Sequence, residues 1–233
     1  MMQGNLIYEI SDLTARYGNL TAIQSLSLGF NFGESVGIFG HNGCGKSTLI
    51  KSLVGAIEDV DGSIKFMDKE IIAGDVPYNI LNGIGMVPQT NNVFPTLAVE
   101  QCLKIAGLRN KYKAIEEVYN LFPLLKERRF QKAGSMSGGE QQILAVAMSL
   151  MTNPKILLLD EPTAGLSPKA SQKVLEALED INKRLKTTII IIEQNVLTTL
   201  DLVERAIILR NGKIVFDDKS EVLKTSTNLW SYF

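Results

Sequence analysis

The distribution of apolar and polar positions along the chain predicts buried strands that alternate with amphipathic helices. Short apolar runs typical of buried strands occupy Ser35–Gly40, Lys155–Pro162 and Thr187–Asn195. Apolar residues at helical spacing follow in Lys46–Gly55 and in Ser171–Lys186. Strands that alternate with helices in this way favour an α/β core built on a parallel sheet.

Three other regions depart from this alternation. The first thirty residues alternate loosely around a turn signal at Tyr17-Gly18-Asn19 and resemble short antiparallel strands. The pattern from Phe94 to about Arg129 is helical and more polar, which indicates an inserted helical subdomain before a further helix over 137–153. Near the end, Asn211-Gly212 between two apolar runs predicts a hairpin.

Composition narrows the functional classes without choosing one. The chain has 233 residues, of which 45% are apolar and 21% charged, and a formal net charge of −1, so no global charge favours nucleic acid or an anionic membrane. No apolar run approaches the roughly 20 residues that cross a bilayer, and the start lacks the pattern of a secretion signal. Cys44 and Cys102 suggest neither a disulfide framework nor a metal site. We therefore expect a cytosolic protein that acts on membranes only through a partner.

The segment GHNGCGKST matches the phosphate-binding pattern G-x-x-x-x-G-K-[ST], after a strand and at the start of a helix. Glycines allow backbone N–H groups to point at phosphate oxygens, and the helix N-terminus adds partial positive charge. Lys46 can reach the β- and γ-phosphates, and the Ser47 hydroxyl can bind Mg²⁺. The alternative is a glycine-rich turn without chemistry, which would not need lysine and hydroxyl in register. The candidate phosphate-binding residues are Gly40, His41, Asn42, Gly43, Cys44, Gly45, Lys46, Ser47 and Thr48.

Two carboxylates follow a buried strand in the sequence ILLLDEP. Asp160 ends the strand, where its carboxylate can hold Mg²⁺ through coordinated water. Glu161 follows directly and can reach a water in line with the γ-phosphate. An Asp-Glu pair before proline could instead cap the next segment, and the phosphate loop favours the catalytic interpretation.

A second buried strand ends in polar residues. Four isoleucines stop at Glu193, Gln194 and Asn195. Polar side chains at the carboxyl end of a buried parallel strand usually face a ligand. We therefore expect this strand end to lie at the nucleotide site.

The sequence SMSGGEQQ holds a second possible phosphate-binding device. Ser137, Gly138 and Gly139 stand just before a helix and offer a hydroxyl, backbone N–H groups and a helix dipole, and Glu140 follows. A single nucleotide does not require two such devices. The economical explanation is a dimer in which the second device of each chain completes the site of the other.

With these motifs in this order, the chain resembles the ATP-binding subunits of ABC transporters, whose signature begins Leu-Ser-Gly-Gly; here Met136 occupies the leucine position. The resemblance covers essentially the whole chain. It implies one domain over 1–233 with a P-loop NTPase (RecA-like) α/β core. In this division, 1–90 and 150–233 form the nucleotide-binding core with its N-terminal antiparallel β part, and 91–149 form the helical subdomain that carries the signature.

The resemblance also implies roles for individual residues. Tyr17 matches the aromatic residue that stacks on adenine. Gln89 matches a glutamine whose amide oxygen contacts Mg²⁺ and the attacking water. The residues then expected to be catalytic are Lys46, Glu161 and Gln194, and those expected to hold Mg²⁺ are Ser47, Gln89 and Asp160.

Two departures from the common family pattern narrow the resemblance further. Ser167 stands where many members have aspartate, and Gln194 stands where many have histidine. Together with VFPTLAVEQCL and LLLDEPTAGLSP, they are similar to the smaller ATPase subunits of branched-chain amino-acid importers, and to urea-type importer ATPases. Glutamine cannot act as a base, so activation of water would fall to Glu161.

This resemblance implies Mg²⁺-dependent ATP hydrolysis by a dimer, homomeric or heteromeric, that powers solute import. The expected partners are integral membrane permease subunits and an extracytoplasmic solute-binding protein, without nucleic acid. The expected location is peripheral, on the cytoplasmic face of the cell membrane.

Two alternatives stay open at this point. A non-transport ATPase switch acting on DNA or ribosomes usually carries long coiled-coil insertions or two ATPase modules, and neither is evident here. An ATP-binding regulatory subunit with weak hydrolysis would account for Ser167 and Gln194. The sequence does not identify the solute.

Overall fold

The computed structural model describes residues 6–90, 92–111, 114–226 and 229–233, and a six-stranded sheet forms its centre. The strand order is β10-β9-β3-β8-β7-β6, in which β10 is antiparallel to β9 and the other neighbours are parallel. The strands are β3 (Ser35–Phe39), β6 (Ile84–Val87), β7 (Ile156–Asp160), β8 (Thr188–Ile192), β9 (Arg205–Arg210) and β10 (Lys213–Lys219).

Alternate residues of the central strands pack into two different cores. Every residue of β7 and β8 is buried. Ile190 and Ile192 pack in the cluster that contains α1 (Lys46–Leu53), whereas Ile189 and Ile191 pack in the cluster of α6 (Gly138–Leu150) and α7 (Pro168–Leu185). Because side chains alternate across a strand, a run of isoleucines covers both faces. The predicted buried strand is thereby confirmed.

A second sheet, with the order β2-β1-β4-β5, packs over α1 and shares its core. Its strands are β1 (Leu6–Tyr17), β2 (Leu20–Asn31), β4 (Val60–Phe66) and β5 (Lys69–Glu70). The prediction of short N-terminal strands was wrong, since β1 and β2 have 12 residues each. Register shifts interrupt their pairing, and Asp12 and Ser25 have positive φ angles, so these bulged strands bend without ending. The turn at Tyr17–Leu20 is confirmed.

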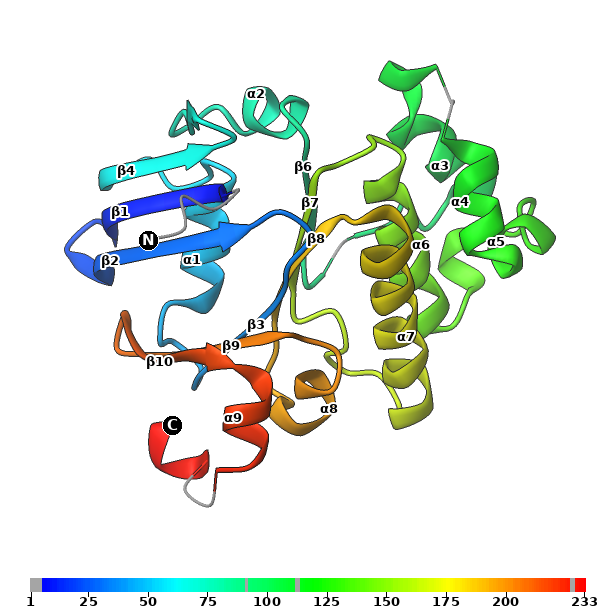
Figure 1. Cartoon of the computed structure of the whole chain (residues 1–233). Coiled ribbons are helices and arrows are strands. Elements are labelled where there is room, and N and C mark those ends of the chain that lie inside the picture. The colour runs from blue at the N-terminus through cyan, green and yellow to red at the C-terminus, as the bar shows by residue number, and fades with distance from the viewer. Residues whose placement is uncertain (1–5, 91, 112–113, 227–228) are drawn as a thin grey trace.

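Helices α3 to α7 lie together on one side of the molecule, opposite the sheet of β1, β2 and β4 (Figure 1). Helix α7 begins at Pro168, earlier than the predicted Ser171, because Ser167 caps it and proline suits the first helical position. The remaining helices are α2 (Val76–Leu81), α3 (Val99–Ala106), α4 (Ile115–Leu121), α5 (Pro123–Glu127), α8 (Val196–Leu200) and α9 (Ser220–Lys224). Short 3₁₀ helices cover Leu108–Asn110, Ala133–Ser135 and Leu229–Tyr232.

The expected α/β architecture is confirmed: a parallel core sheet, an antiparallel β part and an inserted group of helices. Two of the predicted domain limits, residues 1 and 91, lie outside the described residues. Within the described part of the chain, no helix has both the length and the apolar character needed to cross a membrane.

The parallel register of three strands positions the candidate site. Ile192 of β8 pairs with Ile38 of β3 and with Asp160 of β7. The segments that follow these strands therefore leave the sheet at the same edge, which is where ligands bind in open α/β sheets.

Candidate active site

The loop between β3 and α1 requires glycine at several positions. Gly40, Gly43 and Gly45 have φ angles of +145°, +79° and +108°. A Cβ atom on Gly45 would lie 2.7 Å from the carbonyl oxygen of Ala22, and one on Gly40 would lie 2.3 Å from that of Leu209. These backbone conformations and contacts exclude other side chains. Gly45 is also the N-cap of α1 and provides no capping side chain, so the first N–H groups of the helix are left for a ligand.

Neighbouring strands hold this loop from outside. The Gly212 N–H, in the β9–β10 turn, donates to the Cys44 carbonyl at 2.9 Å, and the Gln24 N–H of β2 donates to the Gly212 carbonyl at 3.1 Å. The hairpin predicted at Asn211-Gly212 thus supports the phosphate loop. Tyr17 lies at the end of β1, paired with Leu20 near the start of β2, and is 47% exposed. That exposure leaves the ring of Tyr17 available for stacking, which stays a prediction.

Lys46 and Ser47, the first residues of α1, connect the loop to the strand that carries the carboxylates. The Lys46 ammonium donates to the carbonyl oxygens of Gly40 at 2.7 Å and His41 at 3.0 Å. The Ser47 hydroxyl donates to Asp160 Oδ1 at 3.1 Å. The two motifs, whose bonded residues lie 113 positions apart in the sequence, therefore meet through one side-chain hydrogen bond.

Asp160 is buried at the end of β7, and burial raises its pKa, although the hydrogen bond from Ser47 acts in the opposite direction. A nearby cation would favour its charged form. Among the described residues, no group of three His, Cys, Asp or Glu side chains could form a complete metal site. A single carboxylate beside a hydroxyl suits Mg²⁺, which takes one or two protein ligands together with water and substrate phosphates.

Glu161 is held by two amide groups from distant segments. Gln89 Nε2 donates to one carboxylate oxygen at 2.7 Å, and Gln194 Nε2 donates to the other at 2.8 Å. The Glu161 backbone has a φ of +49°, and its N–H donates to the Ile192 carbonyl at 2.9 Å. The structure thus brings together Gln89, Glu161 and Gln194. Each carboxylate oxygen accepts one of these hydrogen bonds and retains a further lone pair that can accept from water.

Glu193 and Thr163 are part of the same site, although the sequence pattern predicts a specific role for neither. One carboxylate oxygen of Glu193 accepts hydrogen bonds from the Thr163 N–H at 2.9 Å and from its hydroxyl at 2.8 Å. Both residues line a cavity of about 450 Å³ together with Glu161 and Gln194. The polar residues that follow the isoleucine run indicate a site at this strand end, but they do not indicate that Glu193 bonds to Thr163.

The candidate signature residues begin helix α6. Ser137 is its N-cap, and Glu140 Oε2 accepts a hydrogen bond from the Ser137 N–H at 3.0 Å and pairs with Arg128 at 3.0 Å. Ser137 and Gly138 are exposed, whereas Met136 packs in the core where a leucine would also fit. In the described part of the chain, no hydrogen bond joins Ser137–Glu140 to Gly40–Thr48.

Two further loop residues differ in their environment. Cys44 is buried, and burial raises its pKa. Its sulfur lies 2.6 Å from where a Cβ on Gly40 would be, which agrees with a small residue that fills space. His41 is exposed, and its ring meets that of Phe233 edge-on, with centroids 6.0 Å apart.

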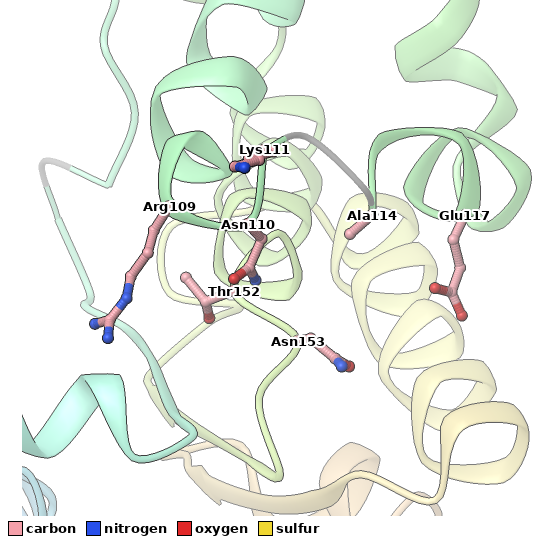
Figure 2. Close-up of a pocket in the computed structure, with 7 residues that line it drawn as sticks. All are labelled: Arg109, Asn110, Lys111, Ala114, Glu117, Thr152 and Asn153. Carbon is pink, nitrogen blue, oxygen red and sulfur yellow. The ribbon is translucent and has the colours of Figure 1, made fainter.

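A separate cavity of about 540 Å³ lies in the helical region. In Figure 2, Arg109 and Glu117 extend at opposite sides of this cavity, and Asn110 and Thr152 lie between them. Asn110 is anchored by a hydrogen bond to the Met151 carbonyl at 3.2 Å. None of its lining residues belongs to the motifs described above, so the cavity is outside the candidate active site.

Three features define a P-loop nucleoside triphosphatase. A glycine loop joins a strand to a helix, a hydroxyl donates to a buried aspartate, and two amides donate to the following glutamate. Comparison with known families specifies it further. The model of the ABC transporter family matches residues 23–164, and the chain belongs to this family. It is an ABC-type ATPase that powers transport.

Relatives match along almost the entire chain. The chain is 40% identical to the high-affinity branched-chain amino acid transport ATP-binding protein BraG of Pseudomonas aeruginosa, over 90% of this chain and 91% of BraG. It is 35% identical to the probable branched-chain amino acid transport ATP-binding protein LivF of Archaeoglobus fulgidus, over 91% of each.

Solved structures agree on the fold. The structure of cbiO1 from Clostridium perfringens, part of the ABC transporter complex cbiONQ, has a TM-score of 0.83 and 26% identity, and covers 95% of this chain and 92% of cbiO1. A nucleotide-free ATP-binding cassette from an ABC transporter has a TM-score of 0.84 and 24% identity, and covers 97% of this chain and 98% of that one. The predicted fold class is confirmed.

Proposed function

We propose that this ATPase drives the import of branched-chain amino acids through separate membrane permease subunits. The observation that carries the proposal is the 40% identity to BraG over nine-tenths of both chains. Gln194, in place of the more common histidine, is the local feature that agrees with this branch.

In this proposal, the nucleotide binds at the carboxyl edge of the central sheet. The loop Gly40–Thr48 surrounds the phosphates with N–H groups, and Lys46 neutralises phosphate charge. Tyr17 stacks on adenine. Ser47 and Asp160 hold Mg²⁺, with the amide oxygen of Gln89 as a further ligand, and the metal ion supplies additional neutralisation of the phosphate oxygens.

Glu161 orients and polarises the attacking water. The hydrogen bonds from Gln89 and Gln194 support this role because they fix the orientation of the carboxylate. Gln194 can donate to the γ-phosphate or to Glu161 and cannot remove a proton from water. The water-activating role therefore belongs to Glu161 alone.

A second ATPase chain, either a copy or a related subunit, completes each site. Ser137, Gly138 and Gly139 then act on the ATP held by the other chain. The exposure of Ser137 and Gly138 at a helix start supports this arrangement. Glu140 supports it indirectly, since its carboxylate holds the first turn of the helix.

The helical subdomain, 91–149, would contact the permease subunits, while 1–90 and 150–233 form the nucleotide-binding core. Closure of the dimer around ATP would then move the helical subdomains and the attached permeases. An extracytoplasmic solute-binding protein would deliver the solute, and the ATPase would sit peripherally on the cytoplasmic face of the membrane. The net charge of −1 agrees with the absence of nucleic acid among the partners.

Glu161→Gln tests the catalytic assignment. This variant should retain ATP binding, lose at least about 10²-fold in kcat because the water loses its oriented acceptor, and accumulate an ATP-bound dimer. ATP turnover, nucleotide binding and size-exclusion chromatography provide the three measurements. Glu176→Gln, an exposed substitution on α7, is the matched control and should behave as wild type. Near-normal hydrolysis by Glu161→Gln would exclude the assigned role.

Uptake into proteoliposomes that contain the permease subunits tests the solute. ATP-dependent accumulation of leucine, isoleucine or valine supports the proposal. Accumulation of urea without these amino acids would contradict it.

A further inference from the structure

The buried run of β8 continues one residue beyond the strand and ends at a carboxylate, Glu193. Glu193 is 3% exposed, and burial raises its pKa. A fifth apolar residue would extend the isoleucine run of β8 without removing a carboxylate from water, which is unfavourable. The presence of glutamate at this position therefore calls for a role beyond packing.

The Glu193 carboxylate connects the two segments that carry the proposed catalytic side chains. It accepts from the N–H and the hydroxyl of Thr163, which lies two residues after Glu161. Its other oxygen accepts from the N–H of Gln194 at 3.3 Å. Gln194 in turn donates to Glu161 at 2.8 Å. Together with the backbone from Glu161 to Thr163, these contacts form a closed ring that includes the Glu161 carboxylate.

The backbone at Glu161 needs such support. Its φ of +49° lies in the left-handed region, which a residue with a Cβ adopts at a cost in free energy. A conformation of this kind persists when the surrounding structure holds it. On one side the Glu161 N–H is bonded to Ile192, and on the other Thr163 is anchored by Glu193.

We propose that Glu193 is a positioning residue for ATP hydrolysis, which anchors Thr163 so that the Glu161 carboxylate stays oriented toward Gln194 and the attacking water. The inference rests on the proposed role of Glu161. Glu193 does not contact the reacting atoms, and its effect passes through Thr163 and Gln194. It therefore acts on the hydrolysis step and leaves the phosphate loop unchanged.

Steady-state ATP hydrolysis by the full chain tests this role. Glu193→Ala should lower kcat by about 10- to 100-fold, since small displacements of catalytic groups have effects of this size, while KM for ATP stays within about twofold. Thr163→Val removes the hydroxyl donor and should lower kcat by about three- to tenfold. Thr163→Ser keeps the donor, and its kcat should stay close to that of wild type. The double variant Glu193→Ala/Thr163→Val should be no slower than Glu193→Ala, because both changes break the same contact.

Asn79→Ala is the control for a purely structural effect. Asn79 is a buried amide on α2 that bonds to Ile72 and to the Val54 carbonyl, and it makes no hydrogen bond to the site residues. This substitution should lower Tm without changing kcat per folded molecule. Glu193→Ala should differ by lowering kcat in protein that is demonstrably folded.

Wild-type kcat in folded Glu193→Ala would overturn the inference, as would a raised KM with unchanged kcat. If Glu193→Ala does not fold, equal kcat in Thr163→Val and Thr163→Ser would overturn it. Glu161→Gln in the same assay separates the two proposals. If Glu161→Gln is inactive while Glu193→Ala and Thr163→Val are fully active, only the positioning role of Glu193 is excluded. If Glu161→Gln is active, the catalytic role of Glu161 and the positioning role of Glu193 are both excluded.

Discussion

Two glycine-containing segments in this chain begin helices, but their glycines are required for different reasons. Gly45, before α1, has a φ of +108°, and a Cβ there would lie 2.7 Å from a backbone oxygen, that of Ala22. Gly139, in the first turn of α6, is helical, and a Cβ there would lie 2.8 Å from the Cβ of Ala170 on α7. The first glycine is required by its own backbone, the second by the close approach of another helix.

The two helix starts also differ in what they leave available. Helix α1 has no capping side chain and carries Lys46, which remains within the loop. Helix α6 is capped by its own Glu140 and offers the exposed Ser137 and Gly138. The start of α1 thus combines a cation with free helix N–H groups, whereas Ser137–Gly139 at the start of α6 combine an exposed hydroxyl with no cation. The following predictions test this difference.

Lys46→Ala should have the largest effect. Removing the cation that we propose neutralises phosphate charge should lower hydrolysis by about 10²- to 10³-fold, comparable to the loss of one preorganised electrostatic group. ATP turnover and equilibrium binding of ATP measure it. Lys183→Ala, which removes an exposed lysine from α7, is the control and should leave both unchanged. Measurable turnover at the wild-type rate in Lys46→Ala would show that another group supplies this charge.

Ser137→Ala should have a smaller effect, because it removes one hydroxyl from the site that a second chain completes in the proposed dimer. Hydrolysis should fall by about tenfold or more, while binding of ATP to the isolated chain stays normal. Mixing Ser137→Ala chains with Lys46→Ala chains should recover activity, since one of the two sites in a mixed dimer then has an intact loop and an intact signature. Failure to recover activity in the mixture would contradict pairing between copies of this chain.

Gly139→Ala should have the smallest effect on activity and act mainly on stability. Overpacking against Ala170 should lower the free energy of unfolding by about 1–3 kcal/mol, measured by urea denaturation. Ala170→Gly in the same chain should restore part of this loss by making room. Gly45→Ala should not be rescued by Ala22→Gly, since the obstacle there is a backbone oxygen and φ is positive. Rescue of Gly45→Ala by Ala22→Gly, or no rescue of Gly139→Ala by Ala170→Gly, would show that the two glycines are not required for different reasons.

Much of the site could be predicted because its elements are local in sequence. The spacing of Gly40, Gly45, Lys46 and Ser47 predicts a phosphate loop, and the apolar run before Asp160 predicts a buried strand. The lengths of the N-terminal strands were less well predicted, because bulges at Asp12 and Ser25 bend the strands without ending them. Those bulges arise from pairing between strands, which the sequence pattern of a single strand does not contain.

The chemical groups of this protein can be read from the order of its residues: the loop glycines, the lysine, the hydroxyl, the two carboxylates and the isoleucine strand. Which of these groups meet depends on the folded chain. Gln89 and Gln194 converge on Glu161, and Glu193 anchors Thr163, across separations of 72, 33 and 30 residues. The physical reason is that composition and spacing fix local backbone geometry, whereas side-chain contacts between distant segments depend on strand order and register.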